Sequence, residues 1–201
     1  MYSRGEKFQY NNTGFVLLGI IMETVTGMPF DQYLQKILFE PAGMTHTGYY
    51  ETDRLPGNCA NAYMRDRRTG EMCTNIFAVD AKGTGAGGVY TTAEDMAQML
   101  YNIGHDDNMF LNINSQSDII DIMGKVKNTT LIKAGLPAGV DFIHKTGDIG
   151  TMLGDAGIVY LPSGQRYIVV ILAKRPHNHI NGRLYIQEAS KIIYNYMSLK
   201  N

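Results

Sequence analysis

Three apolar runs in the last third of the 201-residue sequence restrict the fold more than any other feature. They lie at residues 140–146, 155–161 and 166–173, are rich in β-branched side chains, and are separated by glycine or by a Pro-Ser-Gly-Gln turn. Runs of this length between turn signals are typical of strands joined by short connections. We therefore predict a three-stranded antiparallel meander.

The segments before and after this meander have apolar residues at helical spacing. Residues 180–198 are predicted to form an amphipathic helix whose one face carries Tyr185, Ala189, Ile192 and Tyr196. Helices are also predicted over 93–103, where Thr92 and Asp95 resemble a capping box, and over 115–127.

The first forty residues predict two more helices. One spans 13–26, begins at Thr13 as N-cap, ends at Gly27 and carries an apolar stripe of Phe15, Leu18, Met22 and Val25. The second spans 30–39, ends before Pro41 and is expected to turn inward Phe30, Leu34, Ile37 and Leu38.

Residues 45–90 have a different character, with short apolar runs and many turn-forming residues. A hairpin turn is predicted at 66–70 between short strands near 61–65 and 71–76, and a glycine-rich bend at 83–88. Helices first, then a meander and a closing helix, indicate an α+β fold in which helices flank an antiparallel sheet.

Composition narrows the class of protein. With 44% hydrophobic and 18% charged residues the chain is globular, and we expect a single domain over 1–201, with a helical and loop part over about 1–135 and the sheet and closing helix over about 136–201. A net charge of −1 argues against a nucleic-acid partner. The run 167–173 is far below the roughly 20 residues of a membrane span.

Other segments carry weak signals. Residues 1–9 are polar and lack the apolar stretch of a signal peptide. Cys59 and Cys73 make neither a disulfide framework nor a four-thiolate zinc site. His177 and His179 have no partner ligand at metal-binding spacing, so we expect an exposed turn, no metal and no cofactor.

The sharpest motif is Lys145, Thr146 and Gly147 at the end of the first predicted strand. A cation, a hydroxyl donor and a glycine that allows close approach suit a substrate carboxylate lying along a strand edge. The alternative is a solvent-exposed strand end with a turn glycine.

A second motif, Tyr10 and Asn12, lies just before the first predicted helix. A phenol beside an amide can move a proton and position a substrate amide. The alternative is an aromatic staple with capping asparagines.

Two further patterns favour structure over chemistry. The spacing of glycines over 83–88 matches G-x-G-x-x-G, but three residues separate it from the next helix cap, so a bend is favoured over a nucleotide site. Glu71 with Asn75 is weakly similar to a deacylating glutamate loop, although the surrounding sequence favours a hairpin edge.

Together these segments resemble the serine β-lactamase and penicillin-binding-protein superfamily, in order along nearly the whole chain. Residues 8–47 resemble its segment with Tyr-x-Asn, a Pro-x-Gly-Met turn and a Thr, and 83–100 its GGxxxTxxDM segment. Residues 134–172 are similar to its Lys-Thr-Gly strand and the two strands that follow. The first half looks more like the broad serine-hydrolase and class C branch, the last third more like class A.

The resemblance implies an acyl-enzyme mechanism on β-lactams, D-alanyl-D-alanine peptides or small esters. It implies that Tyr10 shuttles the proton to the leaving nitrogen and that Asn12 holds the substrate's side-chain amide. Lys145, Thr146 and Gly147 would form the carboxylate wall, and the backbone N–H of Asp148 half of an oxyanion hole, which contributes roughly 3 kcal/mol in comparable sites.

One family element is missing. A Ser-x-x-Lys normally precedes the tyrosine motif, but only nine residues precede Tyr10, and no lysine follows a serine at this spacing. The nearest mimic, Thr130 to Lys133, follows the tyrosine motif. We therefore expect a fold that is incomplete on its N-terminal side, either part of a serine hydrolase or a non-catalytic binding module. Self-association or a complementing N-terminal segment is expected, and the resemblance implies an extracytoplasmic location.

Overall fold

The computed structural model describes residues 6, 9–61, 63–74, 76, 79–105 and 111–200. The chain divides into two compact units. The first unit comprises Met1–Pro41 and Thr45–Thr91, and the second comprises Ala42–Met44 and Thr92–Asn201. Each unit is described by itself. The prediction of a single domain over 1–201 stays a prediction.

The first unit opens with helix α1 (Asn12–Thr26). Asn11, not the expected Thr13, is its N-cap, because the Asn11 side chain accepts a 3.1 Å hydrogen bond from the Gly14 N–H. Gly27 ends the helix in the left-handed conformation with φ 67°, as predicted.

The second predicted helix is two elements, helix α2 (Phe30–Leu34) and π-helix η1 (Gln35–Phe39). The π-helical turn, which is wider than an α-helical one, is closed by a 3.0 Å hydrogen bond from the Glu40 N–H to the Gln35 carbonyl. It turns Phe39 inward, to 6% exposure, and leaves Ile37 48% exposed. The expectation that Ile37 faces inward is therefore wrong, because the residue spacing of an α-helix does not hold here.

A two-stranded antiparallel hairpin, β1 (Tyr63–Arg65) and β2 (Met72–Thr74), confirms the turn predicted at 66–70. The Asp66 carboxylate accepts the N–H groups of Thr69 and Arg68, which hold its pKa below the usual range. Both described strands are shorter than predicted, while Ala62 and Asn75 lie outside the described residues.

The predicted bend at 83–88 is present in the first unit as a tight turn, in which Thr84 and Gly87 exchange backbone hydrogen bonds of 2.8 and 3.0 Å. A side chain at Gly83 would meet the Gly88 backbone at 2.7 Å, so this close approach requires glycine.

The second unit is built around an antiparallel sheet in the order β3-β4-β5. The predicted meander is confirmed by strands β3 (Asp141–Asp148), β4 (Met152–Tyr160) and β5 (Arg166–Lys174). The helices of this unit are α3 (Ala93–Gly104), α4 (Ile113–Gly124), α5 (Ile132–Gly135) and α6 (Asn181–Leu199).

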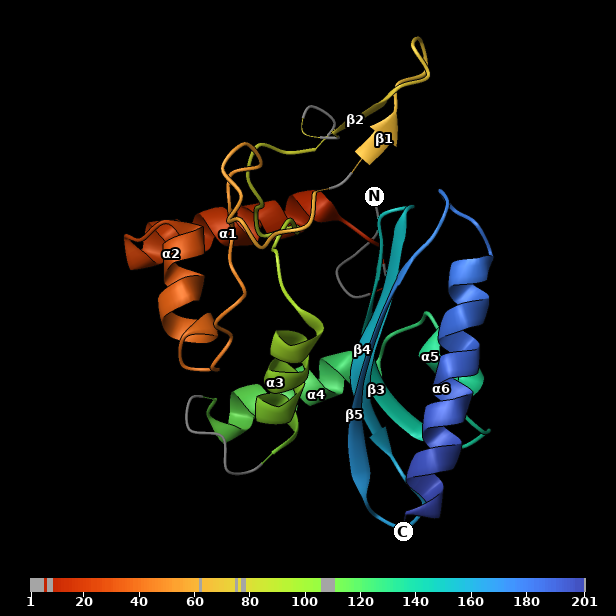
Figure 1. The fold of residues 1–201 in the computed structure, drawn as a ribbon. Coiled ribbons are helices and arrows are strands. Elements are labelled where there is room, and N and C mark those ends of the chain that lie inside the picture. Colours follow the sequence, from red (N-terminus) through yellow and green to blue (C-terminus); the bar gives the residue numbers. More distant parts are fainter. Residues whose placement is uncertain are drawn as a thin grey trace. The chain divides into compact units, whose positions relative to one another are not determined.

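Helices cover both faces of this sheet, with α5 and α6 on one face and α3 and α4 on the other (Figure 1). On the α6 face, alternate strand residues such as Phe142, Val159 and Val169 pack with Ile186. On the other face, Leu100 of α3 packs with Ile143 and Ile158. The Thr92 side chain caps α3 by accepting the Asp95 N–H at 3.1 Å, as its sequence predicts.

The buried face of α6 differs from the predicted one. Tyr185, Ile192 and Tyr196 are 62%, 60% and 55% exposed, whereas Ile186 is fully buried and Ser190 nearly so. Apolar residues occur on both sides of this helix. The side that is buried carries the small residues Gly182 and Ser190, and Ser190 lies where α5 approaches. A side chain at Gly135 of α5 would lie 2.2 Å from the carbonyl oxygen of Gln187, so the two backbones approach closely.

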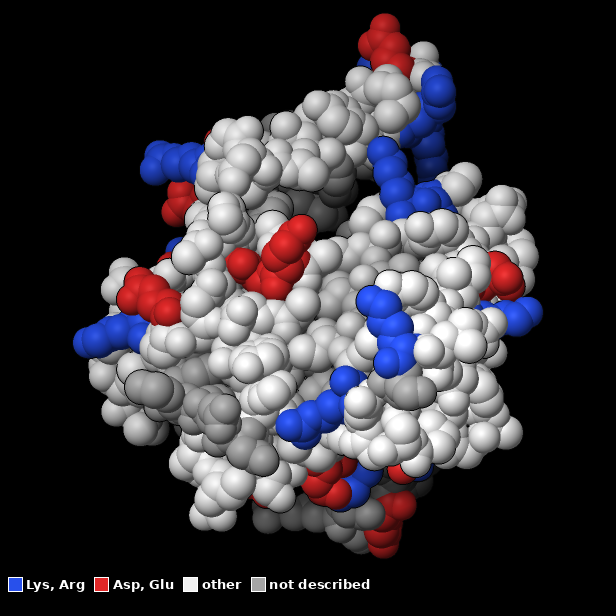
Figure 2. Space-filling view, turned by 60° about the horizontal axis from the view of Figure 1, so that its bottom comes forward, with Lys and Arg blue, Asp and Glu red and all other residues white. Residues whose placement is uncertain are grey.

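The expected α+β class, with helices flanking an antiparallel sheet, is confirmed by this architecture and by the structural relatives reported below. Among the described helices none is alone long and apolar enough to cross a membrane; α1 together with the bent continuation Phe30–Phe39, at 77°, passes the same test as a pair. On the described part of the face in Figure 2, acidic and basic side chains are scattered among uncharged ones and form no large field of one sign.

Candidate functional site

Strand β3 presents the Lys145 motif at the outer edge of the sheet. Among the described residues β3 pairs only with β4, in a register that sets Lys145 opposite Ala156 and Gly147 opposite Gly154. Lys145 and Gly147 are exposed and Thr146 is half-buried. The Lys145 ammonium donates a hydrogen bond to the Thr146 carbonyl. A cation, a hydroxyl and an accessible strand edge therefore lie within three residues.

A buried pair fixes β3 beneath this motif. His144 Nδ1 lies 2.8 Å from Asp155 Oδ1 of β4, with side chains 4% and 0% exposed. The other Asp155 oxygen accepts the Ile132 N–H of α5 at 3.0 Å. Because successive strand residues face opposite sides, His144 ties one face of β3 to β4 and α5 while Lys145 points to the other.

Asp148 ends β3, and its carboxylate is held by two groups. It accepts the Gly150 N–H at 2.8 Å and the Arg175 guanidinium at 2.5 Å. The Gly150 hydrogen bond, followed by the hydrogen bond and charge of Arg175 and the charge of Arg183, holds the pKa of Asp148 below its usual value. The sequence prediction gave Asp148 a role through its backbone N–H and did not consider its carboxylate.

Arg175 is the site residue that sequence reasoning missed. It follows β5 directly, and a charge there is normally solvated. A signal was present, since alternate residues Tyr167, Val169, Ile171 and Ala173 face the buried side, and the same alternation continues to Arg175.

Tyr10 and Asn12 belong to the first unit and lie around the start of α1. Tyr10 is 74% exposed, and Asn12 is the first helical residue and is also exposed. Asn11, between them, performs the capping. The alternative interpretation of capping asparagines therefore holds for Asn11, and leaves the side chains of Tyr10 and Asn12 accessible.

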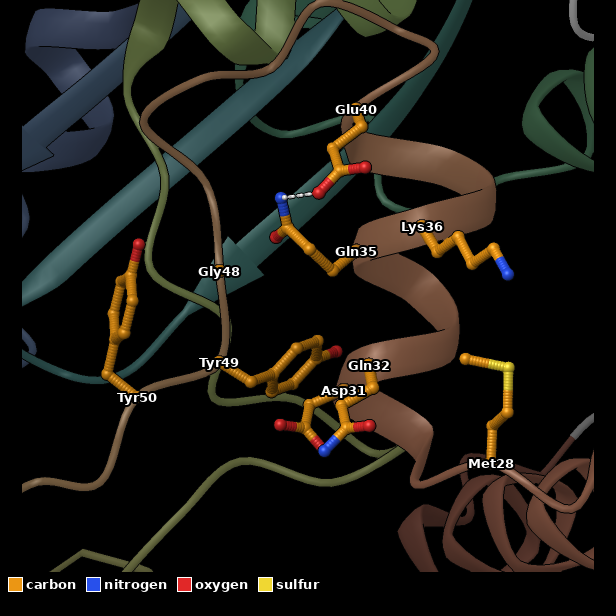
Figure 3. Close-up of a pocket in the computed structure, with 9 residues that line it drawn as sticks. All are labelled: Met28, Asp31, Gln32, Gln35, Lys36, Glu40, Gly48, Tyr49 and Tyr50. Atoms are coloured by element: carbon orange, nitrogen blue, oxygen red, sulfur yellow. Dashed lines mark hydrogen bonds between the residues drawn. The ribbon is translucent and has the colours of Figure 1, made fainter.

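The first unit also contains a hollow of about 570 Å³ that includes no predicted site residue. In Figure 3, Tyr49 points across it toward the helical wall with Gln32, and Gln35 binds Glu40 at 3.3 Å. Burial raises the pKa of Tyr49. The lining consists of Met28, Asp31, Gln32, Gln35, Lys36, Glu40, Gly48, Tyr49 and Tyr50.

No group of three His, Cys, Asp or Glu side chains within the described ranges could hold a metal ion. His177 and His179 lie in the connection between β5 and α6, where both are exposed, as expected of a turn. Cys59 and Cys73 are free thiols. Glu71 is exposed at the hairpin edge, and Asn75 lies outside the described residues.

The sheet with its flanking helices and the Lys-Thr-Gly edge define a β-lactamase-like class of protein. The model of the Beta-lactamase enzyme family matches residues 38–197, and the chain belongs to this family. The matched range contains the Lys145 motif, whereas Tyr10 and Asn12 precede it.

Three similar proteins agree with this membership. A penicillin-binding protein from Bacillus halodurans has a TM-score of 0.70 and 26% identity over 96% of this chain and 57% of its own. The acyl-enzyme complex of a PBP-A mutant with penicillin G has a TM-score of 0.52 and 36% identity over 56% of this chain and 42% of its own. An Escherichia coli (strain K12) protein named as a D-alanyl-D-alanine carboxypeptidase is 44% identical over 46 residues, 23% of this chain and 11% of that protein. The chain thus spans 57% of the length of the first of these relatives and less than half of the other two.

Proposed function

We propose that this chain forms two walls of the substrate site of a serine acyl hydrolase. The substrates would be β-lactams, D-alanyl-D-alanine peptides or small esters, opened through an acyl-enzyme. The observation that carries the proposal is the exposed edge of β3, where Lys145, Thr146 and Gly147 stand on a strand fixed from below by the His144 and Asp155 pair.

The β3 edge suits the carboxylate of such a substrate. Lys145 supplies a positive charge, Thr146 a hydroxyl donor, and Gly147 leaves the backbone open to close approach. The N–H of Asp148 would then face the oxygen that becomes negative during acyl transfer. Likeness to the PBP-A mutant, whose complex with penicillin G is an acyl-enzyme, supports this class of substrate.

The start of α1 would form the second wall. Tyr10 is the proposed proton shuttle and Asn12 the proposed partner of the substrate amide, and both side chains are accessible in the first unit. Their roles rest on residue type and order in the sequence.

Binding to the Lys145 wall can be tested without acylation. N-acetyl-D-alanyl-D-alanine, titrated into the chain, should shift the backbone amide NMR signals of 145–148, and Lys145→Gln should weaken that binding about tenfold because it removes the cation facing the carboxylate. Lys191→Gln, on the exposed side of α6, is the matched control and should bind as the natural chain does. Equal binding by both variants would remove the basis of the proposal.

A second test asks whether the chain is acylated, and whether it is part of a hydrolase or a non-catalytic binding module. No Ser-x-x-Lys occurs in this sequence, so we expect a labelled penicillin to leave the chain unmodified. Stoichiometric covalent labelling would contradict that expectation. Dipeptide binding without labelling fits both a wall of a hydrolase and a non-catalytic binding module, and an in-frame Ser-x-x-Lys upstream of Met1 in the genome would favour the hydrolase.

The partners and location are proposals of the same kind. Apolar side chains exposed on α1, including Phe15, Leu18 and Ile21, lead us to expect self-association or binding of a complementing N-terminal segment. A monodisperse monomer by light scattering would count against this. Family membership leads us to infer an extracytoplasmic location, which fractionation of cells of the source organism would test.

A further inference from the structure

Arg175 is a buried charge at the end of the candidate carboxylate wall. Its side chain is 5% exposed, and burying an unpaired guanidinium is costly. It is not unpaired: Nη2 donates to Asp148 Oδ1 at 2.5 Å and Nε donates to the Gly150 carbonyl at 2.9 Å. Arg175 therefore connects the segment after β5 to the turn after β3.

The surroundings leave this connection little freedom. The backbone N–H of Arg175 also binds the Thr151 carbonyl, at 2.8 Å. A side chain at Gly150, whose φ is 79°, would meet the His177 ring at 2.7 Å, and one at Gly182 would meet Arg175 Cδ at 2.7 Å. The turn is therefore packed against the connection between β5 and α6, and Arg175 is packed against the start of α6.

The charges near the wall explain why such a connection matters. Asp148 ends β3 three residues after Lys145, so its side chain is on the opposite face of the strand, while its backbone N–H is the proposed donor to the acyl oxygen. A free carboxylate at this place would repel an anionic ligand and oppose negative charge developing on the acyl oxygen. With Arg175 paired to it, Lys145, Asp148 and Arg175 together carry a net charge of about +1.

We propose that Arg175 is a positioning residue of this wall: it cancels the charge of Asp148 and fixes the turn after β3, so that Lys145 faces an anionic ligand unopposed. The inference rests on the proposed function. It goes beyond that function because it assigns the ligand preference to a buried residue outside the Lys-Thr-Gly motif.

The first test needs no ligand. The carboxyl ¹³C signal of Asp148 is followed against pH in the natural chain, in Arg175→Gln and in Arg175→Lys. The charged groups that act on this carboxylate are Arg175 and Arg183 of α6, and the His177 ring lies beside the neighbouring Gly150. The pKa of Asp148 should rise in Arg175→Gln and less in Arg175→Lys, and exchange of the Gly150 amide should accelerate. An unchanged pKa and exchange rate in both variants would overturn the inference.

The second test measures affinity for N-acetyl-D-alanyl-D-alanine. Arg175→Gln should weaken binding about tenfold, because it exposes the ligand to the Asp148 charge. Adding Asp148→Asn to that variant should restore most of the affinity, since no charge is left to cancel. Arg166→Gln, at the exposed start of β5, is the control and should change affinity less than about twofold.

The outcomes separate the two proposals. A double variant that binds as weakly as Arg175→Gln would overturn the charge role of Arg175 while leaving the proposed function standing. If the natural chain does not bind the dipeptide, the proposed function fails, and the Asp148 titration alone decides whether Arg175 holds the turn and the charge. Should Arg175→Gln not fold, Arg175→Lys and the double variant carry both measurements.

Discussion

The two units of this chain bury their apolar side chains to different extents. In the second unit, two clusters of buried side chains cover both faces of the β3-β4-β5 sheet, with Ile158 and Ile186 at their centres. In the first unit, α1 exposes about half or more of Phe15, Leu17, Leu18, Ile20 and Ile21. Both units form helices with proper caps, so local signals suffice for helices, while a closed core needs several layers.

The largest expected effect tests the buried pair beneath the Lys145 wall. Asp155→Ala should destabilise the second unit by about 4 kcal/mol, because it leaves the His144 ring and the Ile132 N–H without their buried acceptor. Asp155→Asn retains one acceptor and should lose less. Denaturant unfolding measures both, with Asp141→Ala, at the exposed start of β3, as control.

If the free energy of unfolding of Asp155→Ala lies within about 1 kcal/mol of that of the natural chain, the His144 and Asp155 pair does not anchor β3.

A second prediction addresses the contrast in burial directly. Ile186→Ala in α6 should destabilise the second unit by about 3 kcal/mol, because its fully buried side chain leaves a cavity between helix and sheet. Ile192→Ala, in the same helix and 60% exposed, should change stability by less than about 0.5 kcal/mol. Ile20→Ala in α1 should behave like Ile192→Ala, and a cost as large as that of Ile186→Ala would show that α1 is covered in solution.

This contrast also marks how much the sequence alone could predict. The three strands begin and end within three residues of their predicted positions, because β-branched runs between turns have few alternatives when both faces are covered. The inward face of α6 was mispredicted, since Ile186 and Ile192 are equally apolar and only packing against the sheet and α5 distinguishes them. The π-helical turn was not predicted either; it places Phe39 in a stacked contact with Tyr49, and no local pattern encodes that contact.

The candidate site divides in the same way. Lys145, Thr146 and Gly147 could be found because a short motif at a strand end is visible in one dimension. The inward orientation of Arg175 is visible in the strand alternation, but its role is not, because that role depends on a contact with Asp148 across 27 residues. The roles of Tyr10 and Asn12 stay predictions.

Alkaline pH provides the third prediction. Burial, and secondly the charge of Tyr194, raise the pKa of Tyr167 from 10.0 to about 12. The folded state therefore retains this proton after the unfolded state has lost it, and the stabilisation is full below pH 10 and lost as the pH rises toward 12, at up to about 1.4 kcal/mol per pH unit.

Tyr167→Phe should remove this part of the decline in unfolding free energy between pH 10 and 12. Tyr49→Phe in the first unit is the comparison, because burial also raises the pKa of Tyr49. A decline in Tyr167→Phe as steep as in the natural chain would contradict the assignment.

The fourth prediction removes the same kind of N-cap hydrogen bond from one helix in each unit. Asn11→Ala and Thr92→Ala each remove a side-chain acceptor from a first-turn N–H and should cost about 1 kcal/mol. The expected readouts differ, because Thr92→Ala acts on a helix packed against the sheet and Asn11→Ala on one that is largely exposed. Thr92→Ala should lower the unfolding midpoint of the second unit, whereas Asn11→Ala should mainly reduce helical circular dichroism. Serine at either position should restore the loss.

The smallest expected effect is that of the ion pair between Lys82 and Asp31 in the first unit. The two charged atoms lie 2.7 Å apart, but the side chains are 39% and 27% exposed, so water screens their attraction. Lys82→Met should cost at most about 1 kcal/mol at low salt, and the difference should vanish near 1 M salt, where the screening length is about 3 Å. A cost that persists at high salt would mean that this pair is desolvated in solution, and that the first unit is more closely covered than its exposed α1 side chains indicate.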